Sequence, residues 1–188
     1  MTTPAWDAVF LDRDGTINVS AGPGRYILTP DQLELLPGAA VAIGRLCAAG
    51  VTVFVVTNQR CVHLGLLSAG SLEAVNARLR ELLLGFGAEL AEVLVCPHGE
   101  GECGCRKPAD GLLRQAFDRY PDLDPLRCAI VGDSSADVRA GDALGLTRVL
   151  LASADTPVPF AQVELVAKDL AEAVDALLGN PTPGRMSR

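Results

Sequence analysis

The chain has 188 residues, 49% of them hydrophobic, and a formal net charge of −7. This length suits one domain with a sizeable core, and the acidic balance argues against a general binder of nucleic acids or anionic membranes. We expect a single domain over residues 1–178 and a flexible tail over residues 179–188, where Pro and Gly are frequent. The N-terminus lacks a basic segment followed by an apolar run, so we expect no secretory signal. We also expect the protein to be cytoplasmic and monomeric.

The first predicted element is a short buried strand over residues 9–11, which ends at a polar turn. Asp12 and Asp14 follow it, and Gly15 and Thr16 complete the turn. In an open α/β sheet, chemistry takes place at the carboxyl ends of the strands. Two carboxylates this close repel each other unless a cation or a shared proton intervenes. Asp-Gly alone is also common in surface turns, so the preceding apolar strand is what favours a catalytic site here.

The next elements lead to a second polar strand end. Residues 19–37 contain several Gly and Pro residues and predict a loop or small flap, and residues 37–49 predict a helix. Residues 51–56 are apolar on both faces, as expected of a central parallel strand. That strand ends at Thr57 and Asn58, where a hydroxyl and backbone N–H groups can bond a phosphoryl oxygen. A plain polar turn is the alternative interpretation.

Strands and helices alternate along the remaining chain, which implies a parallel sheet layered by helices. Strands are predicted over residues 92–96, 128–132 and 147–151, and helices over residues 71–84, 111–120, 138–144 and 167–178. We expect Asp110 to cap the helix that starts at residue 111.

A cluster of cysteines and one histidine follows the strand at 92–96. Cys96, His98, Cys103 and Cys105 provide three thiolates and an imidazole, a set suited to tetrahedral Zn²⁺. Because protein side chains can fill all four positions, we expect a closed, structural zinc site. The alternative is a chance cluster of free cysteines in a flexible loop. The glutamates within this loop, at residues 100 and 102, are expected to be solvated charges.

Four motifs together resemble those of the haloacid dehalogenase-like phosphohydrolases. They are Asp12 to Thr16, Thr57 to Gln59, the pair Arg106-Lys107, and Asp133 to Asp137. The cysteine and histidine loop before Arg106 narrows the resemblance to heptose bisphosphate phosphatases and histidinol phosphatases. This resemblance covers Ala8 to about Leu178 and implies a Rossmann-like sheet with the first strand central, the fourth strand beside it and no large cap domain.

The resemblance also implies catalytic roles. Asp12 would be the nucleophile, and Asp14 would protonate the leaving group and later activate water. Thr57 and Lys107 would stabilise charge on the phosphoryl group. Mg²⁺ would be bound by Asp12, Asp133 and the backbone carbonyl of Asp14. Asp137 would orient the loop or a water on the metal.

Four further residues are predicted to bind substrate: Asn58, Arg60, His63 and Arg106. The zinc loop would fix Arg106 and Lys107 in place. The loop over residues 60–65 departs from the pattern of related heptose phosphatases at Cys61 and His63, and we expect Cys61 to be an exposed thiol.

The preferred substrate is a heptose 1,7-bisphosphate that loses its C7 phosphate, an assignment that depends on the resemblance. Residue spacing alone supports a Mg²⁺-dependent phosphomonoesterase. Histidinol phosphate is the nearest alternative substrate. A nucleic-acid 3′-phosphatase is disfavoured because the sequence has no evident basic groove. A zinc-stabilised binding module without catalysis is the remaining alternative, and it predicts phosphate-ester binding without turnover.

Overall fold

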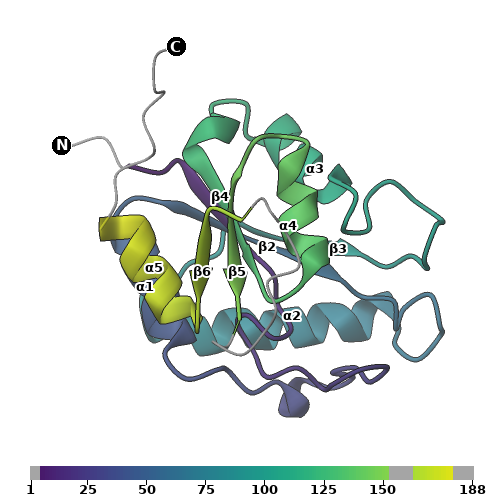
Figure 1. The fold of residues 1–188 in the computed structure, drawn as a ribbon. Coiled ribbons are helices and arrows are strands. Elements are labelled where there is room, and N and C mark those ends of the chain that lie inside the picture. Colours follow the sequence, from purple (N-terminus) through teal and green to yellow (C-terminus); the bar gives the residue numbers. More distant parts are fainter. Residues whose placement is uncertain (1–4, 153–162, 180–188) are drawn as a thin grey trace.

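The computed structural model describes residues 5–152 and 163–179. Within these residues, six parallel strands form one sheet in the order β3-β2-β1-β4-β5-β6 (Figure 1). The strands are β1 (Ala8–Leu11), β2 (Thr52–Asn58), β3 (Glu92–Cys96), β4 (Cys128–Gly132), β5 (Thr147–Leu151) and β6 (Leu165–Ala167). The helices are α1 (Ala39–Ala48), α2 (Ala69–Leu84), α3 (Gly111–Arg119), α4 (Ser135–Asp142) and α5 (Leu170–Gly179), with short 3-10 turns η1 (Pro30–Gln32) and η2 (Pro125–Arg127).

Helices cover both faces of the sheet, which is why its central strands are apolar on both sides. Along β1, Val9 and Leu11 face the core formed with α1, α2 and α5. Ala8 and Phe10 face the opposite core, formed with α3 and α4. This two-residue alternation is the geometry of a strand, so each face of β1 is buried by a different helix layer.

β1 lies at the centre of the sheet, between β2 and β4. The chain runs from β1 to β2 on one side and only later returns to β4 on the other side. The carboxyl end of β1 is therefore the switch point of the sheet, where α/β proteins bind ligands. The predicted fold class is confirmed: the sheet is parallel, and the described residues contain no large cap domain.

The predicted strands over 92–96, 128–132 and 147–151 match β3, β4 and β5. The expected closing helix over residues 167–178 corresponds to α5, which begins three residues later, at Leu170. Strand β6, which pairs with β5, was not predicted. Asp110 occupies the N-cap position of α3, as expected, but its side chain makes no capping hydrogen bond to the helix; its carboxylate pairs instead with Arg114, one turn along the helix, at 2.7 Å.

The predicted loop over residues 19–37 contains the short turn η1 and an antiparallel bridge between Leu35 and Asn18. The predicted tail lies outside the described residues from 180 onward. None of the helices in the described part of the chain is both long and apolar enough to cross a membrane.

Candidate active site

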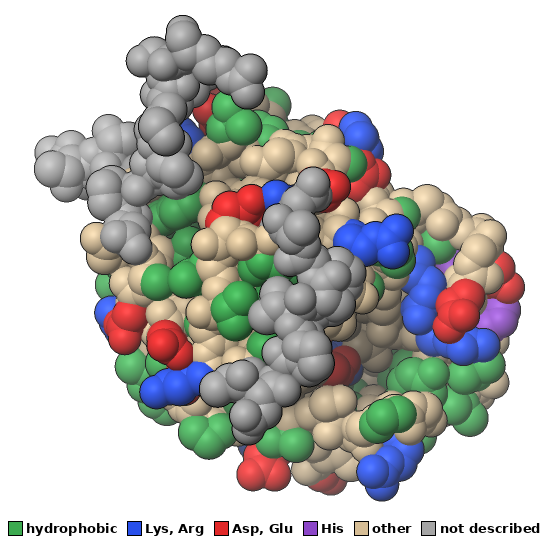
Figure 2. Space-filling view, viewed as in Figure 1, with side chains coloured by type: hydrophobic (Ala, Val, Ile, Leu, Met, Phe, Trp, Pro, Cys, Tyr) green, Lys and Arg blue, Asp and Glu red, His purple; other side chains and the backbone are tan. Residues whose placement is uncertain are grey.

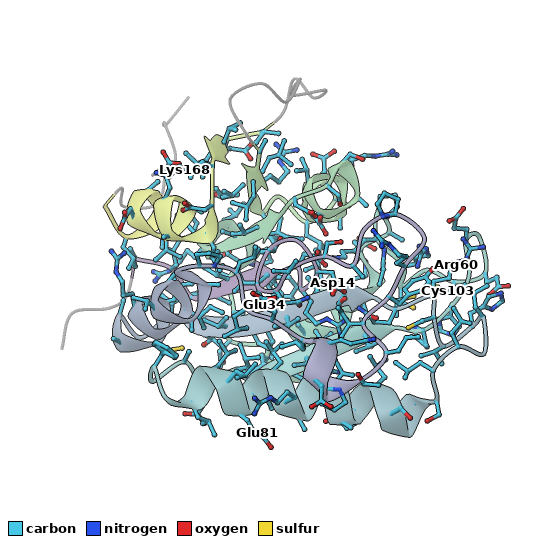
Figure 3. The ribbon with its side chains drawn as sticks, turned by 90° about the horizontal axis from the view of Figure 1, so that it is seen from below. Asp14, Glu34, Arg60, Glu81, Cys103 and Lys168 are labelled. Atoms are coloured by element: carbon cyan, nitrogen blue, oxygen red, sulfur yellow. The ribbon has the colours of Figure 1, made fainter. Side chains whose placement is uncertain are left out.

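The carboxyl ends of β1, β2 and β4 and the loop after β3 enclose a cavity of about 190 Å³. Its lining is polar and acidic and comprises Asp12, Asp14, Thr57, Asn58, Lys107, Ser134, Ala136 and Asp137. Figure 3 shows Asp14 near the middle of the molecule, beside the sheet. The structure therefore brings together residues from all four motifs of the sequence.

Lys107 is the positive charge of this cavity, and it is buried. Its Nζ lies 2.6 Å from Asp12 Oδ1 and 2.5 Å from Asp137 Oδ1, and it donates to the carbonyl oxygen of Val56 at 2.6 Å. Burial alone would lower the pKa of Lys107, but the carboxylates of Asp12 and Asp137 outweigh it and raise the pKa. The ammonium therefore stays charged beside Asp12.

Asn58 fixes the backbone of Lys107. Its side-chain Nδ2 donates to the Lys107 carbonyl oxygen at 2.9 Å, and its Oδ1 accepts from the Lys107 N–H at 3.0 Å. Since both ends of the amide are engaged, Asn58 links the end of β2 to the loop that presents the lysine. Its predicted contact with substrate stays a prediction.

Three carboxylates lie close to one another beside Lys107. One oxygen each from Asp12, Asp133 and Asp137 lies within 4.8 Å of the others. Burial, together with Asp137 and Asp133, raises the pKa of Asp12 to about 7 against the opposing effect of Lys107. Burial and the charge of Asp137 raise the pKa of Asp133 to about 6. This crowding of acidic oxygens suits a hard divalent cation such as Mg²⁺.

Position 15 lies so close to the carboxylate of Asp133 that it has no room for a side chain, which explains why this residue is a glycine. A Cβ at position 15, where φ is +93°, would lie 2.0 Å from Asp133 Oδ2. Asp137 is held from its other side, because the N–H of Ser134 donates to its Oδ2 at 3.1 Å in a capping box at the start of α4. Asp137 thus has both the expected orienting contacts and an oxygen in the carboxylate cluster.

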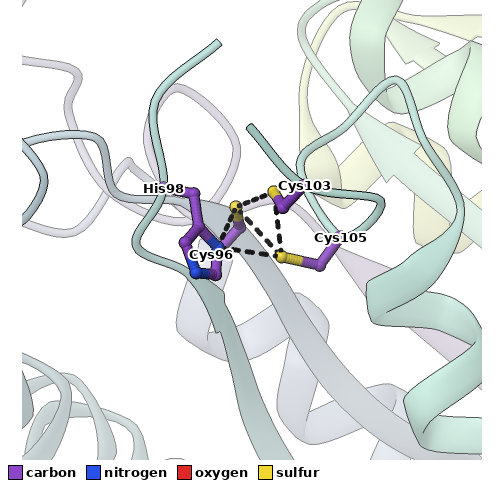
Figure 4. Close-up of side chains that lie close together, drawn as sticks. All are labelled: Cys96, His98, Cys103 and Cys105. Atoms are coloured by element: carbon purple, nitrogen blue, oxygen red, sulfur yellow. Dashed lines mark hydrogen bonds between the residues drawn. The ribbon is translucent and has the colours of Figure 1, made fainter. Parts of the chain in front are cut away.

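A second cluster lies at the end of β3 (Figure 4). The sulfur atoms of Cys96, Cys103 and Cys105 are 3.3–3.6 Å apart, and His98 Nδ1 lies 3.3 Å from Cys105 and 3.7 Å from Cys96. In a tetrahedron with metal–sulfur distances of about 2.3 Å, the sulfurs would be roughly 3.8 Å apart. The four predicted ligands therefore converge in an arrangement that fits zinc.

The zinc-loop glutamates are not simply solvated charges, as the sequence suggested. Glu100 pairs with Arg60 at 3.2 Å and Glu102 pairs with His63 at 3.0 Å, although all four side chains stay partly exposed. Charged side chains of both signs gather beside a histidine on this side of the molecule (Figure 2). The expectation that Cys61 is exposed is also wrong, since it is fully buried in a cluster with Leu67 and Leu72.

Sequence reasoning missed Arg13, which stands inside the first motif. Its side chain is fully buried and pairs with Asp14 at 2.9 Å. No signal in the sequence indicated this burial, because Arg13 lies in a polar turn, where an arginine is usually exposed. Arg106, a predicted substrate contact, has a buried Nη1 without a hydrogen-bond partner within the described residues.

Comparison with known proteins agrees with this geometry. Residues 104–173 match the HAD-hydrolase-like family model. The chain is 39% identical over 175 residues to the D-glycero-beta-D-manno-heptose-1,7-bisphosphate 7-phosphatase of Pseudomonas aeruginosa, covering 90% of this chain and 97% of that protein. The chain belongs to this phosphatase family within the HAD-like hydrolases.

Other members of the heptose-1,7-bisphosphate 7-phosphatase family support the assignment. The Mycobacterium tuberculosis D-glycero-alpha-D-manno-heptose-1,7-bisphosphate 7-phosphatase is 42% identical over 131 residues, 69% of this chain and 68% of that one. The D,D-heptose 1,7-bisphosphate phosphatase structure from Bordetella bronchiseptica, complexed with magnesium and phosphate, superposes with a TM-score of 0.81 at 32% identity. It covers 92% of this chain and 98% of that chain. The predicted family is confirmed.

Proposed function

We propose that this protein is a Mg²⁺-dependent phosphomonoesterase that removes the C7 phosphate of a heptose 1,7-bisphosphate through an aspartyl phosphate on Asp12. One observation carries the chemistry. Asp12 Oδ1 lies 2.6 Å from the buried ammonium of Lys107, in a cavity that two further carboxylates border. A carboxylate beside a fixed positive charge is suited to attack an anionic phosphate ester, because the charge offsets the repulsion between them.

The first step forms a bond between a carboxylate oxygen of Asp12 and phosphorus, while the bond to the sugar oxygen breaks. Asp14 gives a proton to the departing alkoxide. Lys107 and the hydroxyl of Thr57 stabilise charge on the phosphoryl oxygens. In the second step Asp14 takes a proton from water, the water oxygen attacks phosphorus, and phosphate leaves with the carboxylate of Asp12 restored.

Two metals fit the side chains present. Asp12, Asp133 and Asp137 offer the oxygen ligands for Mg²⁺, which when bound supplies positive charge to the phosphoryl group. The backbone carbonyl of Asp14 is a further predicted ligand. Cys96, His98, Cys103 and Cys105 would hold Zn²⁺. The zinc site would order the loop that leads directly into Arg106 and Lys107.

The substrate class follows from the relatives named above, which act on 1,7-bisphosphates of either heptose anomer. The buried Nη1 of Arg106, which has no hydrogen-bond partner among the residues that the structure describes, supports a second anionic contact with such a substrate. Arg60 and His63 stay predicted contacts, although Arg60 forms an ion pair with Glu100 and His63 Nδ1 lies 3.0 Å from a carboxylate oxygen of Glu102.

The test measures kcat/KM with Mg²⁺ for both anomers of the heptose 1,7-bisphosphate and for histidinol phosphate. We expect at least one anomer to exceed histidinol phosphate clearly, with the 1-phosphate as the product seen by phosphorus NMR. A preference for histidinol phosphate, or release of the C1 phosphate, would refute the substrate assignment. Binding of all three esters without turnover would refute the enzymatic one.

A further inference from the structure

The carboxylate of Asp14 is surrounded by side-chain donors. Arg13 Nη2 donates to Oδ2 at 2.9 Å and to Oδ1 at 3.2 Å. Gln59 Nε2 donates to Oδ2 at 2.8 Å, and Asn18 Nδ2 donates to Oδ1 at 3.0 Å. Both carboxylate oxygens are thus held from several sides, while Asp14 still lines the cavity beside Asp12. Two of these donors are themselves held by residues outside the cavity.

The first chain of contacts starts on helix α2. Asn76 is buried there, and its Oδ1 accepts from Arg13 Nη1 at 3.2 Å. Arg13 pairs with no carboxylate other than Asp14 in residues 5–152 and 163–179. A buried guanidinium needs such partners, because leaving its charge unpaired away from water is costly. Asn76 therefore fixes one end of the guanidinium and so directs the other end at Asp14.

The second chain starts at Cys61. Its thiol donates to Gln59 Oε1 with a sulfur–oxygen distance of 3.6 Å. This contact occupies the amide oxygen while Nε2 faces Asp14 and Thr57; the opposite orientation would place that oxygen against the Asp14 carboxylate. Gln59 Nε2 also donates to Thr57 Oγ1 at 2.8 Å, which leaves the hydroxyl hydrogen of Thr57 free for a phosphoryl oxygen.

We propose that Asn76 and Cys61 are positioning residues that act through Arg13 and Gln59 to aim Asp14 at the leaving-group oxygen. Proton transfer depends steeply on hydrogen-bond geometry, so a loosely held carboxylate transfers its proton less efficiently. The inference deepens the proposed function, because it rests on Asp14 as the acid of the first step. It also gives the unusual residue in the 60–65 loop, Cys61, a role that does not involve its reactivity.

The test uses esters whose leaving groups differ in their need for a proton: p-nitrophenyl, phenyl and benzyl phosphate. Nitrophenolate leaves readily without protonation, whereas the benzyl alkoxide does not. The variants are Asn76→Leu, which removes the acceptor for Arg13, and Cys61→Ala, which removes the thiol donor. For each, kcat/KM for benzyl phosphate should fall by about tenfold or more, within the range that general acid catalysis contributes, and by less for p-nitrophenyl phosphate.

Conservative variants separate positioning from packing. Asn76→Asp keeps an oxygen acceptor at the same place and Cys61→Ser keeps a donor, so both should recover most of the benzyl phosphate activity. Leu79→Ala is the matched control, because Leu79 is a buried apolar residue of the same helix, α2. It should lower the thermal midpoint and affect all three esters alike. Equal losses on all three esters for Asn76→Leu and Cys61→Ala would overturn the inference.

Asp14→Asn distinguishes this inference from the proposed function. If Asp14 is the acid, Asp14→Asn shows the same dependence on the leaving group, and adding Asn76→Leu lowers kcat/KM no further. If Asp14→Asn shows no such dependence, the proposed role of Asp14 is wrong. If Asp14→Asn shows this dependence on the leaving group but the Asn76 and Cys61 variants do not, then only the positioning role is wrong. An additional full loss in the double variant would likewise show that Asn76 acts independently of Asp14.

Discussion

The two ligand clusters of this protein are built in opposite ways. The carboxylate cluster takes Asp12 from the end of β1 and Asp133 and Asp137 from the segment after β4, so it exists only when the sheet has formed. The thiolate and imidazole cluster takes all its ligands from one loop, Cys96 to Cys105. The first lines a cavity and contacts a buried lysine, whereas the second offers four protein side chains, enough to complete a tetrahedral site. An open site suits chemistry and a closed site suits structure.

The largest expected effect comes from the open cluster. Asp12→Asn should reduce turnover on the order of a thousandfold or more, as loss of a catalytic nucleophile does, because an amide is a poor nucleophile. Zinc content, measured by elemental analysis, should stay at about one ion per chain, as four protein ligands require. Aluminium fluoride bound at a carboxylate other than Asp12 in a crystal would argue against this assignment.

Breaking the closed cluster should act on stability first. Cys103→Ser removes one of the four predicted zinc ligands, and a loss of a few kcal/mol would lower the thermal midpoint by roughly 10 °C. Activity should fall as well, because the same loop presents Arg106 and Lys107. Brief EDTA treatment of the wild type should instead remove activity that added Mg²⁺ restores, with zinc retained. Zinc-free protein with full activity and an unchanged midpoint would contradict the structural role.

The carboxylate cluster should also make stability depend on pH. The pKa values of Asp12 and Asp133 are raised from 3.8 to about 7 and about 6, so the folded protein holds protons that the unfolded chain releases. Without Mg²⁺, the contribution of these groups is therefore present at about pH 4 and lost as pH rises to about 7. Thermal midpoints across this range should fall less steeply for Asp133→Asn, and less steeply for the wild type with Mg²⁺. Identical slopes under all three conditions would show that the cluster does not titrate in this way.

The smallest effect is expected from the contact between His63, in the loop over residues 60–65, and Glu102, in the zinc loop. His63 and Glu102 form a half-exposed pair, so His63→Gln and Glu102→Gln should each change KM by no more than about fivefold, equivalent to 1 kcal/mol. If His63 contacts the distal phosphate, as predicted, the rise in KM for His63→Gln should be larger for a bisphosphate than for its matching monophosphate, whereas Glu102→Gln should affect both esters alike. Equal changes for both esters in both variants would show that His63 does not contact the distal phosphate.

The sequence predicts the main elements well because their periodicities are local. β3, β4 and β5 are short apolar runs bounded by turn residues. The motifs that follow such strands can be recognised along the chain without knowing how the strands pair. β6 was missed since three residues are too few for a period to show, and it exists only by pairing with β5. Asp110 is a similar case, because its carboxylate can bond either the helix N-terminus or Arg114, and residue type does not decide between them.

The environment of Asp14 was beyond sequence reasoning for a different reason. Arg13 has an ordinary place in a polar turn, and its burial depends on Asn76, 63 residues further along the chain. The expectation that Cys61 is exposed was wrong for the same reason, because residues distant in the sequence cover it. Spacing along the chain identifies the groups that react, but it does not show which distant side chains hold them.

The central position of β1 has a consequence for synthesis on the ribosome. Asp12 and Asp14 are translated well before Lys107, which pairs with Asp12 and follows it 95 residues later. At about 5–20 residues per second, this interval lasts roughly 5–20 s. During that time the nascent chain carries an acidic pair without its lysine and a central strand that lacks β4, one of its two neighbours. A later segment of the chain therefore completes the site that an earlier segment began.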